Sequence, residues 1–198
     1  MTKVAALVLA GGSARRLGGV DKPLLALGGL PLLARILDRV GLPDIAISAN
    51  GDPARFAMFG LPVLDDGPFV GQGPLAGVLA GLDWAERLNA GALLTIPGDT
   101  PFVPAGLAEA LAPAPACAAS NGRVHHLVAL WPVSCLDGLR AVLAVNGRRD
   151  VRHFAELIGM RPVDFGTMKR DPFTNINTRE DIAAARAMLD ERGQEGAA

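Results

Sequence analysis

An unbroken run of seven apolar residues, Val4–Ala10, stands near the start of the chain and ends at the glycine pair Gly11-Gly12. A short apolar run bounded by turn residues is typical of a β-strand that is buried on both faces. Strands of that kind occur mainly in parallel sheets, where helices cover both faces. The run therefore favours an α/β fold. In such a fold, helical and strand patterns must alternate along the chain that follows.

The first half of the chain shows this alternation. Further apolar runs predict strands, and 3.6-residue spacing predicts helices. The predicted strands are Ile45–Ala49, Leu61–Leu64 and Ala92–Ile96, and the predicted helices are Pro31–Val40, Pro74–Leu88 and Pro104–Leu111. Such an order predicts an α/β fold with a mostly parallel sheet flanked by helices. Ligands of such sheets bind beyond the carboxyl ends of the strands, where most polar, glycine-rich segments of this chain lie.

The second half of the chain is less regular. The strands predicted there are Ala116–Ala119, Leu127–Trp131 and Pro162–Phe165, and the helices are Leu136–Val145, Val151–Ile158 and Arg179–Glu191. Thr178 and Asp181 form a variant of the capping box at the start of the last helix. At about 150 residues per domain, we expect residues 1–198 to form one domain.

Composition and charge exclude several classes of protein. Half of the residues are hydrophobic and 20% are charged, which excludes a disordered chain. The net charge is −1, so binding to nucleic acid through bulk charge is not expected. Apolar runs of seven residues are too short to cross a bilayer, and no signal peptide is evident, so we expect a cytoplasmic protein without membrane contact. Cys117 and Cys135 form no CxxC pair, which argues against a disulfide scaffold or zinc ribbon.

The segment Gly11–Lys22 is a glycine-rich loop that directly follows the first strand and carries Arg15, Arg16 and Lys22. Backbone N–H groups of such loops can approach phosphate oxygens closely, and the three cations could neutralise them. A solvated surface loop is the plain alternative, but two glycine pairs with three cations after a buried strand favour an anion site. No Gly-Lys-Ser/Thr occurs in the chain, so this is not a Walker A loop.

The segment Gly71–Gly77 has the spacing GxGxxxG, with Pro74 at the start of a predicted helix. A dinucleotide fingerprint would lie directly between the first strand and its helix, so a dehydrogenase is a weak alternative. We expect close helix packing through Gly77, with N–H groups of the helix start facing a ligand.

Asp99 follows a buried strand and lies between Pro97 and Pro101. One carboxylate, together with ligand phosphates and water, is a usual arrangement for Mg²⁺. The alternative is that Asp99 caps the next helix, but Thr100 and Pro104 lie nearer to that helix, so the metal role is favoured.

Asn175 and Asn177 stand two residues apart in an extended segment and could read a polar heterocycle, although turn and cap chemistry is the commoner role of asparagine. His125 and His126 lack metal-ligand spacing. Beside Arg123 they could face a phosphate, and a solvated turn is the commoner alternative.

Four motifs together carry a resemblance to a known family. LAGGSARRLGGVDKPLL from residue 9, GPLAG from residue 73, IPGDTPF from residue 96 and NINT from residue 175 resemble the molybdenum cofactor guanylyltransferases in order and spacing. The resemblance implies a Rossmann-like, three-layer nucleotidyltransferase fold. It implies transfer of GMP from GTP to the terminal phosphate of molybdenum-loaded molybdopterin, with Mg²⁺ and release of pyrophosphate. It also implies a nucleotide-binding half over about residues 1–112 and an acceptor-binding half over about residues 113–192.

The resemblance also assigns roles to individual residues. The residues implied to bind GTP are Leu9, Ala10, Gly11, Gly12, Lys22, Asn50, Asp66 and Asp99. Lys22, Arg16 and Asp99 would be catalytic, Asp99 would bind Mg²⁺, and Asn175 and Asn177 would bind the acceptor. The register between Asp65 and Asp66 stays open. His126 stands where the family usually has proline after histidine, which weakens any pterin role of that loop. Other proteins of cofactor biosynthesis and recipient apoenzymes are the implied transient partners.

Two further interpretations stay open at this point. Related enzymes with another base or acceptor, such as the molybdenum cofactor cytidylyltransferases or the cobinamide-phosphate guanylyltransferases, share the pattern. The cytidylyl relatives typically have Ala-Ala-Gly where this chain has Ala10-Gly11-Gly12. A non-catalytic nucleotide-binding module is disfavoured by the presence of Lys22 and Asp99, because a pure binder would not need a metal-binding carboxylate at the reacting end of the nucleotide.

Overall fold

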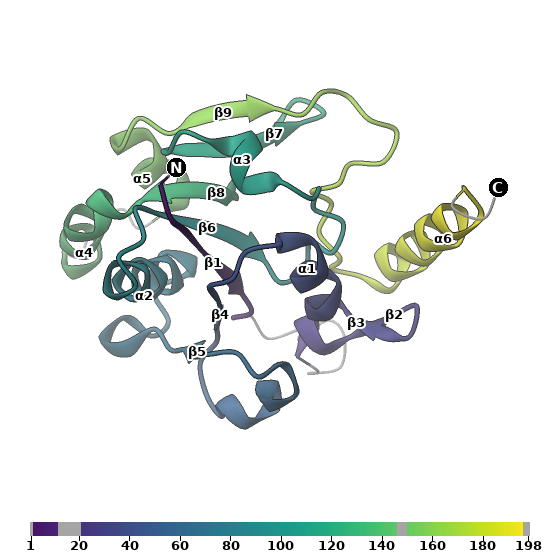
Figure 1. The fold of residues 1–198 in the computed structure, drawn as a ribbon, viewed down its shortest axis with the longest axis horizontal. Coiled ribbons are helices and arrows are strands. Elements are labelled where there is room, and N and C mark those ends of the chain that lie inside the picture. The colour runs from purple at the N-terminus through teal and green to yellow at the C-terminus, as the bar shows by residue number, and fades with distance from the viewer. Residues whose placement is uncertain (1, 12–20, 146–149, 196–198) are drawn as a thin grey trace.

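A computed structural model describes residues 2–11, 21–145 and 150–195 of the chain, and the side chains of 179 and 190–195 are not described. The described residues form three layers, with a central sheet between two sets of helices (Figure 1). The sheet has the strand order β5-β4-β1-β6-β8-β7-β9. Its strands are β1 (Val4–Leu9), β4 (Ile45–Ser48), β5 (Val63–Leu64), β6 (Ala92–Pro97), β7 (Ala116–Ser120), β8 (Arg123–Pro132) and β9 (Arg161–Asp164).

The sheet is mixed but mostly parallel, as predicted. β1 pairs in parallel with β4 and β6, β4 with β5, and β7 with β9. β8 is antiparallel to both β6 and β7. The carboxyl ends of β1, β4 and β6 therefore lie side by side at one edge.

Two hydrophobic layers hold the helices against the sheet. One face is covered by α1 (Leu32–Val40) and α3 (Leu107–Leu111), which pack on residues such as Val8 and Ile96. The other face is covered by α2 (Pro74–Arg87), α4 (Leu136–Ala144) and α5 (Val151–Leu157), which pack on Leu7, Trp131 and neighbours. Alternate residues of β1 thus enter opposite layers, as expected for a strand buried on both faces.

The last helix, α6 (Arg179–Glu195), extends away from the sheet (Figure 1). It packs against a small hairpin, β2 (Ala26–Leu27) and β3 (Leu30–Pro31), and against Phe102. The predicted capping box is confirmed: Asp181 accepts hydrogen bonds from the N–H groups of Asn177 and Thr178, and its own N–H donates to Thr178 Oγ1.

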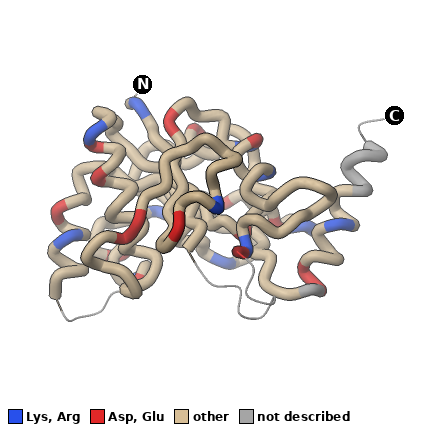
Figure 2. The backbone as a smooth tube through the Cα atoms, turned by 90° about the horizontal axis from the view of Figure 1, so that it is seen from below, with Lys and Arg blue, Asp and Glu red and all other residues tan. Residues whose placement is uncertain are grey.

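Several element predictions needed correction. The helix predicted from Pro104 begins only at Leu107, behind Gly106 in the left-handed conformation. The strand predicted from Leu127 begins at Arg123, and the β2–β3 hairpin was not predicted. No described helix is long and apolar enough to span a membrane. Basic and acidic positions are interspersed along the described chain (Figure 2), in keeping with its near-zero net charge.

Candidate active site

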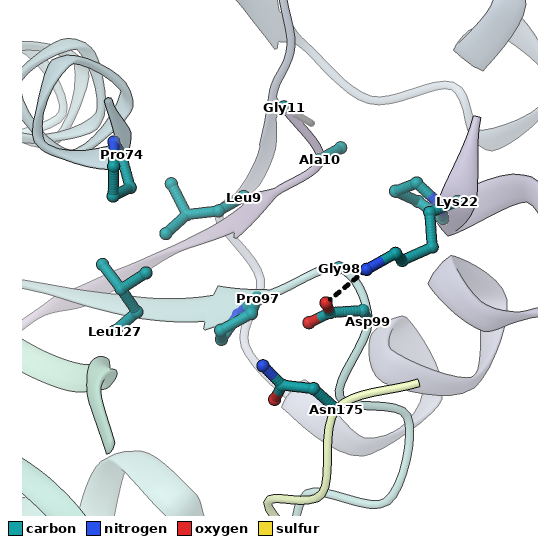
Figure 3. Close-up of a pocket in the computed structure, with 11 residues that line it drawn as sticks. Leu9, Ala10, Gly11, Lys22, Pro74, Pro97, Gly98, Asp99, Leu127 and Asn175 are labelled. Carbon is teal, nitrogen blue, oxygen red and sulfur yellow. Dashed lines mark hydrogen bonds and ion pairs between the residues drawn. The ribbon is translucent and has the colours of Figure 1, made fainter. Parts of the chain in front are cut away.

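Two adjoining cavities lie at the carboxyl ends of β1, β4 and β6 and share Leu9, Gly11 and Pro74 in their walls. One cavity, of about 240 Å³, contains Lys22 and Asp99 (Figure 3). The other, of about 460 Å³, contains Asn50 and Asp66. The site predicted from the strand-end pattern is therefore one continuous cleft with two chemically different ends.

Lys22 and Asp99 form an ion pair at the first end. Lys22 Nζ lies 2.9 Å from Asp99 Oδ2, and about four-fifths of each side chain is buried. Lys22 opens a short 3₁₀ helix, Lys22–Leu24, and Asp99 lies in the turn that follows β6. Asp99 does not cap α3, since that helix begins eight residues later. The carboxylate thus remains available to the cleft, which favours the ligand role over the capping role.

Gly98 allows the turn after β6 to lie close to the end of β1 and to Pro23. Its N–H donates to the carbonyl of Leu9 at 2.9 Å. A Cβ atom at Gly98 would lie 2.9 Å from Pro23 Cγ and 3.1 Å from the carbonyl oxygen of Leu9. A larger residue would therefore displace the backbone that brings Lys22 and Asp99 together.

Asn50 and Asp66 are paired at the second end. Asn50 Nδ2 donates to Asp66 Oδ2 at 2.6 Å, and the N–H of Asp66 donates to Asn50 Oδ1 at 3.0 Å. Asp65 is exposed and instead accepts a bond from the N–H of Gly67. Asp66 and not Asp65 therefore lines this cavity, and contact of Asp66 with the nucleotide stays a prediction.

The start of α2 forms the wall between the two cavities. Pro74 lines both, while Gly71 and Gly73 line the larger one with positive φ values of 82°. Gly77 lies directly against Ser48 and Leu9, so that even a Cβ atom would collide with Ser48 Oγ. Close packing through Gly77 is therefore confirmed, and the helix N-terminus faces the cleft.

Sequence reasoning missed Arg55, which links the two ends of the cleft from outside. Its Nη1 donates to both carboxylate oxygens of Asp21, at 2.7 and 2.9 Å, and its Nη2 donates to the carbonyl of Asn50 at 2.5 Å. Asp21 directly precedes Lys22. The sequence offered as a signal only an arginine shortly after a predicted strand, in what is a 3₁₀ helix over Pro53–Phe59, and such a residue is too common to predict this bridge.

The asparagines near the C-terminal end reach the first cavity. Asn175 Oδ1 accepts a bond from Thr100 Oγ1 at 3.1 Å, and Asn177 Oδ1 accepts one from Lys22 Nζ at 2.5 Å. The N–H of Ile176 donates to the carbonyl of Asp99 at 2.9 Å. Residues 75 and 155 positions apart in the chain thus meet at one place.

The remaining predicted residues divide into three groups. Leu9, Ala10 and Gly11 line the cleft, as expected. Gly12 and Arg16 lie outside the described residues. His125 does not face the cleft but bonds to Ser120, and His126 lines a separate cavity beside α5. Among the described residues, no group of three histidine, cysteine or acidic side chains could hold a metal ion by itself.

Comparison with known proteins decides between the families that share this cleft pattern. Residues 6–158 match the MobA-like NTP transferase domain. The chain is 55% identical over 186 residues to a molybdenum cofactor guanylyltransferase of Acidiphilium cryptum (strain JF-5), covering 92% of this chain and 93% of the relative. It is 50% identical over 190 residues to one of Cereibacter sphaeroides, covering 92% and 95%. The chain belongs to the molybdenum cofactor guanylyltransferase family.

The fold of this guanylyltransferase family member also agrees with solved structures. The molybdopterin-guanine dinucleotide biosynthesis protein A of Archaeoglobus fulgidus superposes with a TM-score of 0.72 at 20% identity, covering 94% of this chain and 99% of that one. The predicted three-layer nucleotidyltransferase fold is confirmed. The family also confirms the predicted enzyme class, and the dehydrogenase and the non-catalytic module are set aside.

Proposed function

We propose that the cleft binds GTP with its guanosine in the Asn50–Asp66 cavity and its triphosphate at Lys22 and Asp99, and that the enzyme transfers GMP to the terminal phosphate of molybdenum-loaded molybdopterin. The observation that carries the proposal is the continuity of two unlike cavities across Leu9, Gly11 and Pro74. One cavity offers paired amide and carboxylate groups, and the other a cation beside a carboxylate. Nucleotides have the same two parts, a polar base with its sugar and an anionic triphosphate.

In the proposed step, an oxygen of the acceptor phosphate attacks the α-phosphorus of GTP. A new P–O bond forms, the bond between the α-phosphorus and the oxygen bridging to the β-phosphorus breaks, and pyrophosphate leaves with that oxygen and its electron pair. The acceptor oxygen is already anionic, so no strong general base is required. Rate enhancement then comes from positioning and charge neutralisation.

Lys22 supplies the cation for the triphosphate. Its Nζ already meets two acceptors, Asp99 Oδ2 and Asn177 Oδ1, so it is held in one position before the nucleotide arrives. A preorganised charge stabilises developing negative charge without further rearrangement. The ammonium group has three N–H donors, so one stays available for a phosphate oxygen when the nucleotide binds.

The donor set also fits Mg²⁺. Asp99 presents a carboxylate to the cleft, and Mg²⁺ binds one or two carboxylates together with substrate phosphates and water. We assign the metal to Asp99. When bound, the ion would neutralise charge on the phosphates.

We assign Asn175 and Asn177 to the acceptor side, because Asn175 lines the first cavity and Asn177 bonds to Lys22. We also place the reaction in the cytoplasm, with transient transfer of the product to other cofactor-biosynthesis proteins and recipient apoenzymes. The thiols of Cys117 and Cys135 are both free and buried, as is usual in a reducing compartment.

The proposal is tested by offering equal concentrations of GTP, CTP and ATP to the enzyme with the molybdenum-loaded acceptor. We expect incorporation of GMP over CMP and AMP, with one pyrophosphate released per GMP and none without acceptor. Equal incorporation of CMP would refute the assignment of the base, and the absence of acceptor-dependent pyrophosphate would refute nucleotidyl transfer.

A further inference from the structure

Ser120, His125 and Asp171 form a buried polar cluster outside the cleft. Ser120 Oγ lies 2.8 Å from His125 Nε2 and 2.8 Å from Asp171 Oδ1. Ser120 has no exposed surface, and the side chains of His125 and Asp171 are 14% and 13% exposed. The three residues come from the end of β7, the start of β8 and the segment before α6.

The donors and acceptors of this cluster permit one proton arrangement. An ionised carboxylate only accepts, so the Ser120 hydroxyl donates to Asp171. Its oxygen then accepts from His125, which must carry its proton on Nε2. Burial lowers the pKa of His125, which favours the neutral ring.

This arrangement is not that of a hydrolytic triad. In a triad the histidine lies between the serine and the acid, and the acid bonds to Nδ1. Here the serine lies between the histidine and the acid, and Asp171 Oδ2 is 3.9 Å from the same Nε2 atom. The hydroxyl is also inaccessible, so the cluster has no nucleophile to offer.

The cluster instead holds the segment that leads into the cleft. Asp171 Oδ1 accepts a second bond, from the N–H of Phe173 at 2.9 Å. The Phe173 ring is 1% exposed and packs against His125 with 5.2 Å between ring centroids. Asn175 and Asn177 follow within four residues and meet Thr100 and Lys22.

The turn between β7 and β8 holds the same segment at a second place. Asn121 Nδ2 donates to the carbonyl of Met168, and Asn121 Oδ1 accepts from the N–H of Met168 at 2.8 Å. The N–H of Phe165 donates to the carbonyl of Ala119. The segment from β9 to α6 is therefore attached to one strand end before it reaches the active site.

We propose that Ser120, His125 and Asp171 are positioning residues that set the placement of Asn175 and Asn177 for the acceptor. The proposal rests on the proposed acceptor role of the two asparagines. It assigns a function to His125 that differs from phosphate or pterin binding. The cluster touches neither substrate, and it acts through the backbone of Phe173.

Steady-state kinetics with both substrates test the proposal. Asp171→Ala should raise the KM for the molybdenum-loaded acceptor by about tenfold or more, because it removes two buried acceptor interactions. The KM for GTP should rise by only about two- to threefold, because Lys22 loses at most its bond to Asn177 and keeps its bond to Asp99. Asp171→Asn should restore most of the acceptor KM, because both bonds go to Oδ1, which the amide retains as an acceptor.

Asp164→Ala is the matched control. Asp164 is an exposed aspartate at the start of the same segment, and it accepts a bond from the N–H of Gly166. Its removal should leave both KM values unchanged. A cluster needed only for folding would lower the active fraction without separating the two KM values, and that result, or an unchanged acceptor KM in Asp171→Ala, would overturn the proposal.

The tautomer of His125 in the unmodified enzyme separates this proposal from the proposed function. Nitrogen-15 NMR at pH 7 should show the proton on Nε2, and a proton on Nδ1 would overturn the cluster geometry. If Asn175→Ala and Asn177→Ala also leave the acceptor KM unchanged, the acceptor assignment fails. In that case the positioning role is also refuted, even if the proton on Nε2 confirms the hydrogen bonds of the cluster.

Discussion

Gly11→Ala is expected to impair use of GTP without destabilising the fold. A Cβ atom at Gly11 would meet no heavy atom of the described residues within 4 Å, apart from the chain neighbours. Gly11 lines both cavities of the cleft. The added methyl group would therefore project into space that the described residues leave open and that a nucleotide would occupy.

The expected magnitude follows from what the methyl group displaces. In the free protein the change in unfolding free energy should stay within about 0.5 kcal/mol, as for substitutions without core contacts. We expect backbone groups of Leu9 and Gly11, which line the cavity, to pair with polar groups of the base. Shifting the base away from them would leave a polar group unpaired, at a cost of about 1–3 kcal/mol. That corresponds to a loss of about tenfold to hundredfold in kcat/KM for GTP. The relative use of CTP should rise, if this turn accounts for the difference from the cytidylyl relatives.

The assay combines thermal unfolding with competition between GTP and CTP. Gly98→Ala is the contrasting variant, because its Cβ would lie 3.1 Å from the carbonyl oxygen of Leu9 and should lower both stability and activity. If Gly11→Ala keeps the GTP rate and the GTP-to-CTP ratio of the unmodified enzyme, the assignment of this turn to the nucleotide is refuted.

Four further results are expected. Lys22→Ala should lower kcat/KM for GTP by about tenfold or more, with partial rescue in Lys22→Arg, and an unchanged value would make the loop structural. Asp99→Asn should lose about 100-fold or more in kcat with an unchanged far-UV spectrum, whereas near-normal transfer in Mg²⁺ would remove this carboxylate from the reaction. Gly81→Ala should destabilise the fold by about 1–3 kcal/mol, because its Cβ would lie 2.6 and 2.8 Å from two buried leucine methyls. Gly138→Ala is the control: its Cβ meets no described atom within 4 Å, so thermal melts should show a stabilisation of about 0.5–1 kcal/mol. Backbone hydrogen bonds hold the pKa of Asp181 below its usual 3.8, so the stabilisation by this carboxylate is present above that pH and is lost as the pH falls. Asp181→Ala should therefore lower the unfolding free energy by about 1 kcal/mol at pH 7 and leave it unchanged in strong acid. An equal loss at both pH values would contradict the capping role.

The sheet could be predicted from the sequence because its central strands are buried on both faces. Val4–Leu9 and Ala92–Pro97 are nearly all apolar, and little else in a soluble fold produces such runs. The β2–β3 hairpin escaped prediction because each of its strands has two residues, too few for any periodicity. The start of β8 escaped prediction because three of the four residues of Arg123–His126 are polar, and pairing with β7 makes this segment a strand.

The cleft was predictable where a motif follows a strand directly, as at Lys22 and Asp99. Contacts between distant segments were not predictable. Arg55 and Asp21 are 34 residues apart, and Ser120 and Asp171 are 51 apart. Single charged or hydroxyl residues in loops carry no local pattern, and only the tertiary fold brings them together. The domain halves and the ligand assignments of individual residues remain predictions.

The division of the cleft is tested most directly by a crystal structure with Mg²⁺ and a GTP analogue whose bond between the α- and β-phosphorus cannot be cleaved. We expect the guanosine beside Asn50 and Asp66, the triphosphate within hydrogen-bond distance of Lys22 Nζ, and the metal on Asp99. A triphosphate beside Asp66, or a nucleotide bound in the separate cavity of His126 and Arg152, would contradict the account.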